Sequence, residues 1–247
     1  MSGHSKWHNI QMKKGKTDAA RAKVFTKIGR EIAVAVKAGG PDPNSNASLR
    51  AVIAKAKAAN MPNDNIARGI KKASGELGQI NYSENVYEGY APGGVAMIVN
   101  TLTDKPNRTI GNVRSYFDKN GGSLGTTGCV SYLFDRMGVI IVEKGNLTED
   151  DVMMAALDAG ADDVIDDEDV FEIRTAPENF AAVMDAISAD SSFKVISGEV
   201  TMVPQSTIEL DKEASARVQK LIDVLEEDDD VQNVYHNAEL VEEEEED

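Results

Sequence analysis

The sequence predicts an α+β protein in three parts: a basic helical module and two domains that mix strands with helices. The length indicates more than one domain, since 247 residues exceed the usual size of a single compact unit. Charge separates the first part from the rest: residues 1–80 hold 15 Lys and Arg against 5 Asp and Glu, whereas the remaining residues hold 11 against 37. Apolar spacing is helical in the basic part and mixes strand and helix patterns beyond it.

The composition is that of a folded globular chain, with 41% hydrophobic and 28% charged residues. No apolar run is long enough to serve as a signal peptide or to span a bilayer. The single cysteine, Cys129, excludes an internal disulfide and fits a reducing compartment. We therefore expect a cytoplasmic protein with no membrane partner.

The net charge of −16 would by itself disfavour a nucleic-acid partner. That average conceals a net +10 in residues 1–80 and a net −26 in the remainder. Such asymmetry is typical of a basic nucleic-acid-binding module joined to an acidic body. The alternative is that the surface charges of two domains diverged without any binding role.

The first 17 residues form a basic arm with too few apolar residues to build a core, so we expect the arm to be mobile. Its tryptophan, Trp7, can stack on an unpaired base or anchor the arm to the helices. His4 and His8 lie four residues apart, but no third ligand is nearby, and we predict no metal site.

Residues 18–37 predict an amphipathic helix. Its apolar residues share one face: Val24, Phe25, Ile28, Ile32, Ala35 and Val36. Its cations share a sector of about 80° on the opposite face: Lys23, Lys27, Arg30 and Lys37. Like charges at this spacing slightly destabilise a helix, so we expect this stripe to face outward and to bind a polyanion.

Two further helices complete the module. Gly39 is expected to cap the first helix, Ser48 to begin a second that ends near Ala59, and a third to follow Pro62. Their inward residues are Leu49, Val52, Ile53, Ala56, Ile66 and Ile70. The module matches a helix-turn-helix in number of elements only, and no recognition helix can be identified.

The residues predicted to contact nucleic acid are Trp7 and the cations of the arm and helices. They are Lys6, Trp7, Lys13, Lys14, Lys16, Arg21, Lys23, Lys27, Arg30, Lys37, Arg50, Lys57, Arg68, Lys71 and Lys72. Three cations of the acidic part either add an auxiliary anion-contacting edge or form ordinary intramolecular pairs: Lys105, Arg108 and Arg114. Arg108 falls in the first turn of a predicted helix, where the helix dipole disfavours a cation.

Beyond residue 80 the pattern predicts a hairpin, a helix and a strand. The hairpin joins residues 85–90 to residues 95–102 through Pro92-Gly93-Gly94. The helix is expected over residues 107–119 and the strand over residues 129–134.

The next segment predicts the order βαββαβ, which is that of the ferredoxin-like sandwich. Its helices begin at Thr148, with Asp151 in capping-box position, and near Pro177. Its strands are expected near residues 139–143, 163–165, 170–174 and 198–203. A strand over 207–210, a helix over 211–226 and a strand over 231–235 are then expected to complete the sheet begun near residue 84.

These elements predict a discontinuous domain organisation. The helical domain covers residues 1–80, the middle α+β domain residues 81–135 with 205–240, and the inserted domain residues 136–204. Residues 241–247 form an acidic tail that is solvated or competes with nucleic acid for the basic helices. The alternative is three domains in series.

No motif in the sequence indicates catalysis or a cofactor. The glycines of residues 121–128 lack the lysine and the strand-to-helix order of a phosphate loop. The acidic residues over 162–169 lack the spacing of a calcium loop, and we expect Cys129 to be a buried strand residue. Three histidines, none beside a nucleophile in the sequence, lead us to predict a protein without enzymatic activity, small-molecule substrate or metal.

Several segments together resemble the YebC family of bacterial regulatory proteins. They are Gly3-His-Ser-Lys-Trp7, Ala22-Lys-Val-Phe-Thr-Lys-Ile28, Arg30-Glu-Ile32, Ala59-Asn-Met-Pro62, Asp64-Asn-Ile66, Tyr87-Glu-Gly-Tyr90, Pro92-Gly-Gly-Val95, Asn107-Arg-Thr109, Leu124-Gly-Thr126 and Val130-Ser-Tyr-Leu-Phe134. The resemblance runs nearly end to end. Departures are confined to single positions: Gln11, Met12, Gly15, Asn63 and Ala91.

The resemblance implies a helical first domain, two α+β domains, a cytosolic location and no catalytic residues. Members of this family are described as DNA-binding transcriptional regulators, which favours DNA and the transcription machinery as partners. Mitochondrial relatives activate translation, and bacterial members have been linked to the relief of ribosome stalling. The alternative is therefore a ribosome-associated translation factor that binds ribosomal or transfer RNA, and a protein-binding scaffold is a third hypothesis. The chain begins at the family motif, which leads us to expect a bacterial protein without a transit peptide.

Overall fold

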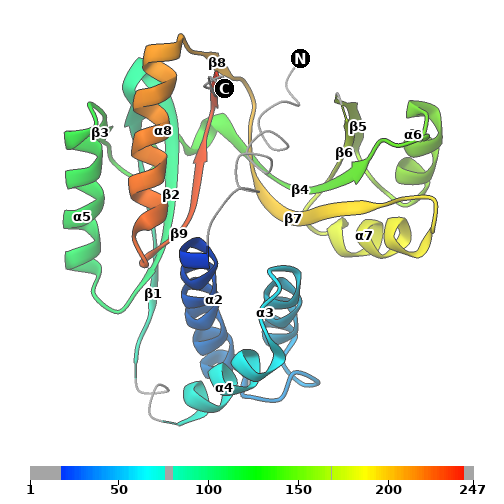
Figure 1. Cartoon of the computed structure of the whole chain (residues 1–247), viewed down its shortest axis with the longest axis horizontal. Helices are drawn as coiled ribbons and strands as arrows, with labels where there is room; N and C mark the ends of the chain where they lie inside the picture. Colours follow the sequence, from blue (N-terminus) through cyan, green and yellow to red (C-terminus); the bar gives the residue numbers. More distant parts are fainter. Residues whose placement is uncertain (1–17, 76–79, 168, 242–247) are drawn as a thin grey trace. The chain divides into compact units, whose positions relative to one another are not determined.

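The computed structural model describes residues 18–75, 80–167 and 169–241 (Figure 1). These residues divide into two compact units: residues 18–129 with 216–234, and residues 130–215 with 235–241. The predicted contacts of the arm, namely Lys6, Trp7, Lys13, Lys14 and Lys16, lie outside the described residues, as does most of the acidic tail.

Three helices begin the first unit, as predicted: α2 (Asp18–Gly39), α3 (Ala47–Ala58) and α4 (Asn63–Ser74). Helix α2 packs against both of the others. Their apolar faces meet in one core, whose buried members include Ile28, Ile32, Leu49, Ala56 and Ile66.

The predicted caps of these helices are wrong by one or two residues. Asn46, not Ser48, caps α3, because its Oδ1 accepts the Leu49 N–H at 3.0 Å. The Asn46 amide also donates to the carbonyls of Ala35 at 2.7 Å and Gly40 at 2.8 Å. Gly40, rather than Gly39, has the left-handed backbone, with φ of 84°.

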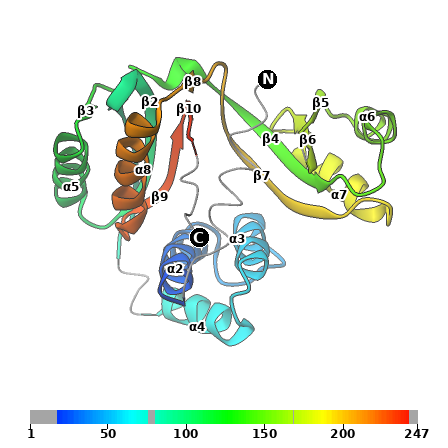
Figure 2. The same ribbon diagram turned by 45° about the horizontal axis from the view of Figure 1, so that its top comes forward.

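The first sheet has the strand order β3-β1-β2-β9. The predicted hairpin is confirmed, with β1 (Ser83–Ala91) paired to β2 (Val95–Thr103) through the 3₁₀ turn Pro92–Gly94. The last strand of this sheet, β9 (Val231–His236), lies beside β2, as expected. Figure 2 shows α5 (Pro106–Lys119) and α8 (Lys212–Glu227) beside these strands.

The glycine-rich segment supplies a strand that the sequence did not reveal. Residues Ser123–Leu124 form β3 and pair with β1 at Gly89 and Tyr90. A Cβ atom on Gly89 would lie 2.5 Å from the Ser123 carbonyl oxygen, so only glycine permits this approach.

The strand predicted over residues 129–134 is wrong. Cys129 is half-buried in a turn, and the 3₁₀ turn Ser131–Leu133 leads into β4 (Phe134–Glu143). Gly128 has φ of 86°, and its N–H donates to the Glu88 carboxylate at 2.8 Å. These features hold the segment before β4 in a turn, so the strand begins only at Phe134.

The second sheet confirms the predicted βαββαβ order. Its strands are β4, β5 (Asp163–Asp166), β6 (Val170–Thr175) and β7 (Val195–Pro204), in the antiparallel order β5-β6-β4-β7. Helices α6 (Glu149–Asp158) and α7 (Phe180–Ala189) share a core with these strands. The capping box of Thr148 and Asp151 is present, whereas α7 begins at Phe180 rather than near Pro177.

One short strand was assigned to the wrong sheet. Instead of completing the first sheet, β8 (Ile208–Glu209) pairs in parallel with β10 (Ala238–Glu239) in a two-stranded sheet. Among the helices of the described residues, none is both long and apolar enough to cross a membrane.

Candidate nucleic-acid interface

Helix α4 presents a cationic face to solvent. Ile66 and Ala73 are buried in the helical core, and Arg68, Lys71 and Lys72 lie on the exposed side. Within the part of the chain that the structure describes, these three cationic side chains form no ion pair or hydrogen bond. Their charges are therefore available to an external anion.

The cations of α3 differ from one another in their partners. Lys57 is exposed and, within the described ranges, also has no side-chain partner. The exposed Arg50 donates to the carbonyls of Pro43 at 2.7 Å and Asn44 at 2.9 Å, and so ties down the loop before α3. Lys55 pairs with Glu31 at 2.7 Å.

The cations at the two ends of α2 are exposed. Arg21 lies in the first turn of α2, and Lys37 lies in its last turn. The Lys37 ammonium donates to the Asn81 side chain and, at 3.5 Å, to the Ile80 carbonyl. Lys37 therefore already has partners just before β1.

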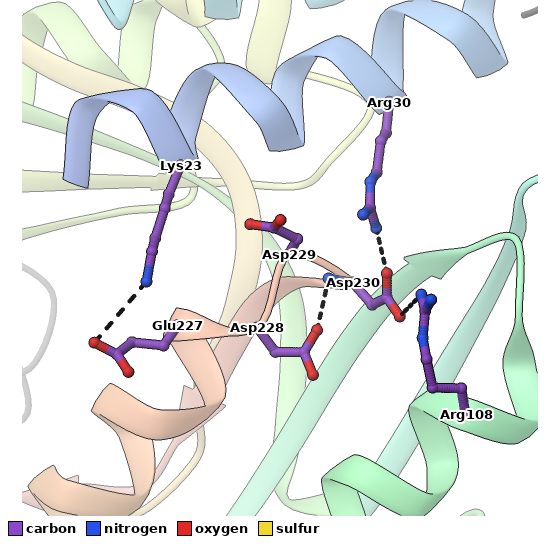
Figure 3. A pocket seen from close by; sticks show the side chains of 7 residues that line it. All are labelled: Lys23, Arg30, Arg108, Glu227, Asp228, Asp229 and Asp230. Atoms are coloured by element: carbon purple, nitrogen blue, oxygen red, sulfur yellow. Dashed lines mark hydrogen bonds and ion pairs between the residues drawn. The ribbon is translucent and has the colours of Figure 1, made fainter. Parts of the chain in front are cut away.

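Arg30 of α2 does not face open solvent, so the expectation that the whole stripe faces outward is corrected for this residue (Figure 3). Arg30 is 17% exposed, and its guanidinium donates to Asp230 Oδ1 at 2.6 Å and to the Leu102 carbonyl at 2.9 Å. It also lies 5.9 Å from the centroid of the Tyr82 ring. The acidic residues between α8 and β9 therefore meet the helix face that was expected to be open.

The two lysines of the stripe contact the last two residues of α8. Lys27 Nζ donates to the Glu226 carbonyl at 2.9 Å. Lys23 Nζ lies 3.9 Å from Glu227 Oε1, and the two side chains are 41% and 72% exposed. We call residues 226–230 the acidic segment.

Asp230 is the centre of these contacts, although its side chain is only 3% exposed. Its Oδ2 accepts from Arg108 at 2.6 Å, from the Thr109 hydroxyl at 2.8 Å and from the Thr103 hydroxyl at 3.1 Å. Burial alone would raise the pKa of the carboxyl group, but the hydrogen bonds from Arg108, Arg30 and Thr109 outweigh it and lower the pKa to about 2. The carboxylate is therefore ionised and held by two guanidinium groups.

Asp228 fixes the backbone of the acidic segment. Its Oδ1 accepts the Asp230 N–H at 2.9 Å, and its Oδ2 accepts from the Tyr116 hydroxyl at 3.0 Å and the Asn112 amide at 3.2 Å. Burial and the Asp228 charge raise the pKa of Tyr116 to about 12, so Tyr116 remains a donor at neutral pH. These bonds connect the acidic segment to α5.

Cations and carboxylates together line a pocket of about 380 Å³ beside Asp230 (Figure 3). The cations are Lys23, Arg30 and Arg108, and the carboxylates are those of Glu227, Asp228, Asp229 and Asp230. No three His, Cys, Asp or Glu side chains of the described residues gather in a way that could hold a metal ion.

The auxiliary edge divides in the same manner. Arg108 pairs with Asp230 and lies 3.7 Å from Asp104, so the alternative of intramolecular pairing holds for this residue. Lys105 and Arg114 are exposed, and across the described ranges their side chains have no partner. Sequence reasoning missed Asp230, although a cation in the first turn of a helix was a signal that a carboxylate partner was needed.

Fold and site together define a mixed α+β protein in which the acidic segment beside the first sheet contacts a basic three-helix region. The chain belongs to the TACO1/YebC family. Residues 5–76 match its N-terminal domain, and residues 82–238 match its second and third domains.

Relatives match this chain in sequence over almost its whole length. A protein of Clostridium tetani named "Probable transcriptional regulatory protein" is 59% identical over 244 residues, covering 98% of this chain and 99% of its own. A protein of the same name from Acetivibrio thermocellus is 59% identical over 239 residues, covering 96% and 98%. The crystal structure of a conserved hypothetical protein from Aquifex aeolicus superposes with a TM-score of 0.80 at 45% identity, covering 95% and 96%.

Proposed function

We propose that this protein is a non-enzymatic regulator of gene expression that binds nucleic acid through its helical region. The observation that carries the proposal is the cationic face of α4, where Arg68, Lys71 and Lys72 are exposed and have no anionic partner among the described residues. Lys57 of α3 adds a fourth cation of this kind. In a chain of net charge −16, a cluster of exposed cations on one helix indicates a polyanionic partner.

These residues suit contacts with phosphate rather than with base edges. Lysine and arginine on a solvent-exposed helix face neutralise phosphates. The resulting contribution to the binding free energy depends on salt concentration but not on the nucleotide sequence. The chain would act in the cytoplasm, without cofactor or substrate, and would recruit other proteins of gene expression through its acidic domains.

The names of the relatives favour DNA, so we propose a DNA-binding transcriptional regulator. The alternative partner is ribosomal or transfer RNA, which the same cations would contact in a ribosome-associated translation factor. Crosslinking in cells followed by sequencing of both DNA and RNA separates them. Promoter enrichment supports transcription, and ribosomal RNA enrichment supports translation.

We also propose that the second sheet is a ferredoxin-like domain inserted into the domain of the first sheet. The strand order β5-β6-β4-β7 and the return of β9 beside β2 support this organisation. The proposed boundaries are 1–80, 81–135 with 205–240, and 136–204. Limited proteolysis of the full chain tests these boundaries through the first sites that are cleaved.

Replacement of the α4 cations tests the binding proposal directly. The triple variant Arg68→Gln, Lys71→Gln, Lys72→Gln removes three phosphate contacts, so its affinity for a labelled DNA duplex should fall at least tenfold, with a salt slope shallower by about 3. Fluorescence anisotropy across NaCl concentrations measures both quantities. The matched control is Arg136→Gln, Lys212→Gln, Lys220→Gln, which removes three exposed cations elsewhere. Equal losses in the two variants would reject the α4 face as the site.

A further inference from the structure

The environment of Asp230 is that of an anion-binding site. Two guanidinium groups, from Arg30 and Arg108, and two hydroxyl groups, from Thr103 and Thr109, all donate to one carboxylate. The same set of donors would suit a phosphate group. In this chain the anion is supplied from within, by an aspartate that lies 200 residues after Arg30.

Contacts weaken from Asp230 toward the solvent. The Arg30–Asp230 pair is nearly closed to water, with a separation of 2.6 Å. Lys27 donates to a backbone carbonyl, and the Lys23–Glu227 pair is long and exposed. An exposed pair of this kind contributes little and is readily exchanged for another anion.

The charges of the segment complement those of α2. Glu227 and Asp229 are exposed, and both line the pocket with Lys23 and Arg30 (Figure 3). Asp229 has no side-chain partner within the described residues. Its negative charge therefore lowers the potential at the stripe without supplying a hydrogen bond that the fold requires.

From these contacts we infer that the acidic segment is an internal substitute for nucleic-acid phosphate that screens Lys23 and Lys27 and so limits the affinity of the helical region. This inference rests on the proposed function and adds regulation to it. Asp230 is the anchor that keeps the segment in place, and Glu227 with Asp229 forms the exposed screen. A phosphate chain that reaches α2 would take over the two lysines while the Arg30–Asp230 anchor remains.

The test removes the screen and keeps the anchor. In the variant Glu227→Gln, Asp229→Asn, the affinity for a fluorescein-labelled DNA duplex should rise about fivefold, because Lys23 and Lys27 are released from competing charges. The salt slope should become steeper by 1 to 2, as about two more phosphates are neutralised. A single-stranded RNA probe is measured in parallel.

Two further variants exclude simpler explanations. The control Asp158→Asn, Asp185→Asn removes the same charge from exposed sites on α6 and α7 and should change the affinity by less than twofold. Lys23→Gln with Lys27→Gln should cost less than twofold in the natural sequence but should abolish the gain in the unscreened variant. If the double variant of the screen does not fold, Glu227→Gln alone tests the same point, because it removes only the 3.9 Å contact.

Each outcome decides the inference. An equal gain in the α6 and α7 control would assign the effect to net charge and overturn it. Unchanged affinity on removal of the screen, while the natural sequence binds, would overturn the screening and leave the proposed function intact. No binding by either protein to either probe would overturn both.

Discussion

Helices α2 and α4 carry cations in similar patterns but use them differently. On α4, Arg68, Lys71 and Lys72 have no partners among the described residues, whereas on α2 the cations Lys23, Lys27 and Arg30 all meet the acidic segment. The α2 stripe therefore stabilises the fold and the α4 face remains available. A helical stripe of charge shows which residues lie together, but not whether they meet solvent or another part of the chain.

The largest effect that sharpens this comparison is expected at Asp230. Asp230→Ala leaves Arg30, two hydroxyl groups and part of Arg108 without their acceptor, so it should lower the free energy of unfolding by about 3 kcal/mol. Urea denaturation measures the loss. Asp229→Ala is the matched control, since its exposed side chain should contribute less than about 0.5 kcal/mol. Similar losses for the two variants would mean that Asp230 is not the anchor.

A smaller effect is expected from acid. The pKa of Asp230 is lowered from 3.8 to about 2 in the folded protein. The ionised Asp230 therefore contributes about 2 kcal/mol to the free energy of unfolding. This contribution is fully present above about pH 4 and is lost as the pH falls through 2. Urea denaturation between pH 2 and 5 should show a steeper loss of stability for the natural sequence than for Asp230→Asn. Parallel pH profiles would contradict the assignment.

The smallest effect is expected when one arginine of each helix is replaced by lysine. Arg30→Lys should cost about 1 kcal/mol, because one ammonium cannot reproduce the planar contacts with Asp230, the Leu102 carbonyl and the Tyr82 ring. Arg68→Lys on α4 should change the stability by less than about 0.5 kcal/mol. Thermal unfolding of both variants tests the difference. A cost at Arg68 equal to that at Arg30 would erase the distinction between the helices.

Local signals in the sequence predicted much of the fold. The Pro92-Gly93-Gly94 turn, the Thr148–Asp151 capping box and the apolar face of each basic helix depend on residues close in the chain. The errors occurred where tertiary contacts decide the local structure. Asn46 caps α3 because its amide also bonds to α2, and Glu88 holds Gly128 in a turn just before the segment that was expected to be a strand.

The site was only partly predictable for the same reason. The exposed cations of α4 followed directly from helical phasing, whereas the partner of Arg30 lies 200 residues away and leaves no local pattern. The run of acidic residues after α8 was visible in the sequence, but only the pairing of β9 with β2 brings it to α2. The arm residues, including Trp7, remain predicted contacts.

The comparison of α2 with α4 is tested most directly by salt-dependent binding of two charge-matched variants to one DNA duplex. The account predicts that Lys71→Gln with Lys72→Gln weakens binding at least fivefold and lowers the salt slope by about 2. It predicts that Lys23→Gln with Lys27→Gln weakens binding less than twofold, since these lysines are screened. A larger loss from the α2 pair than from the α4 pair would contradict the account.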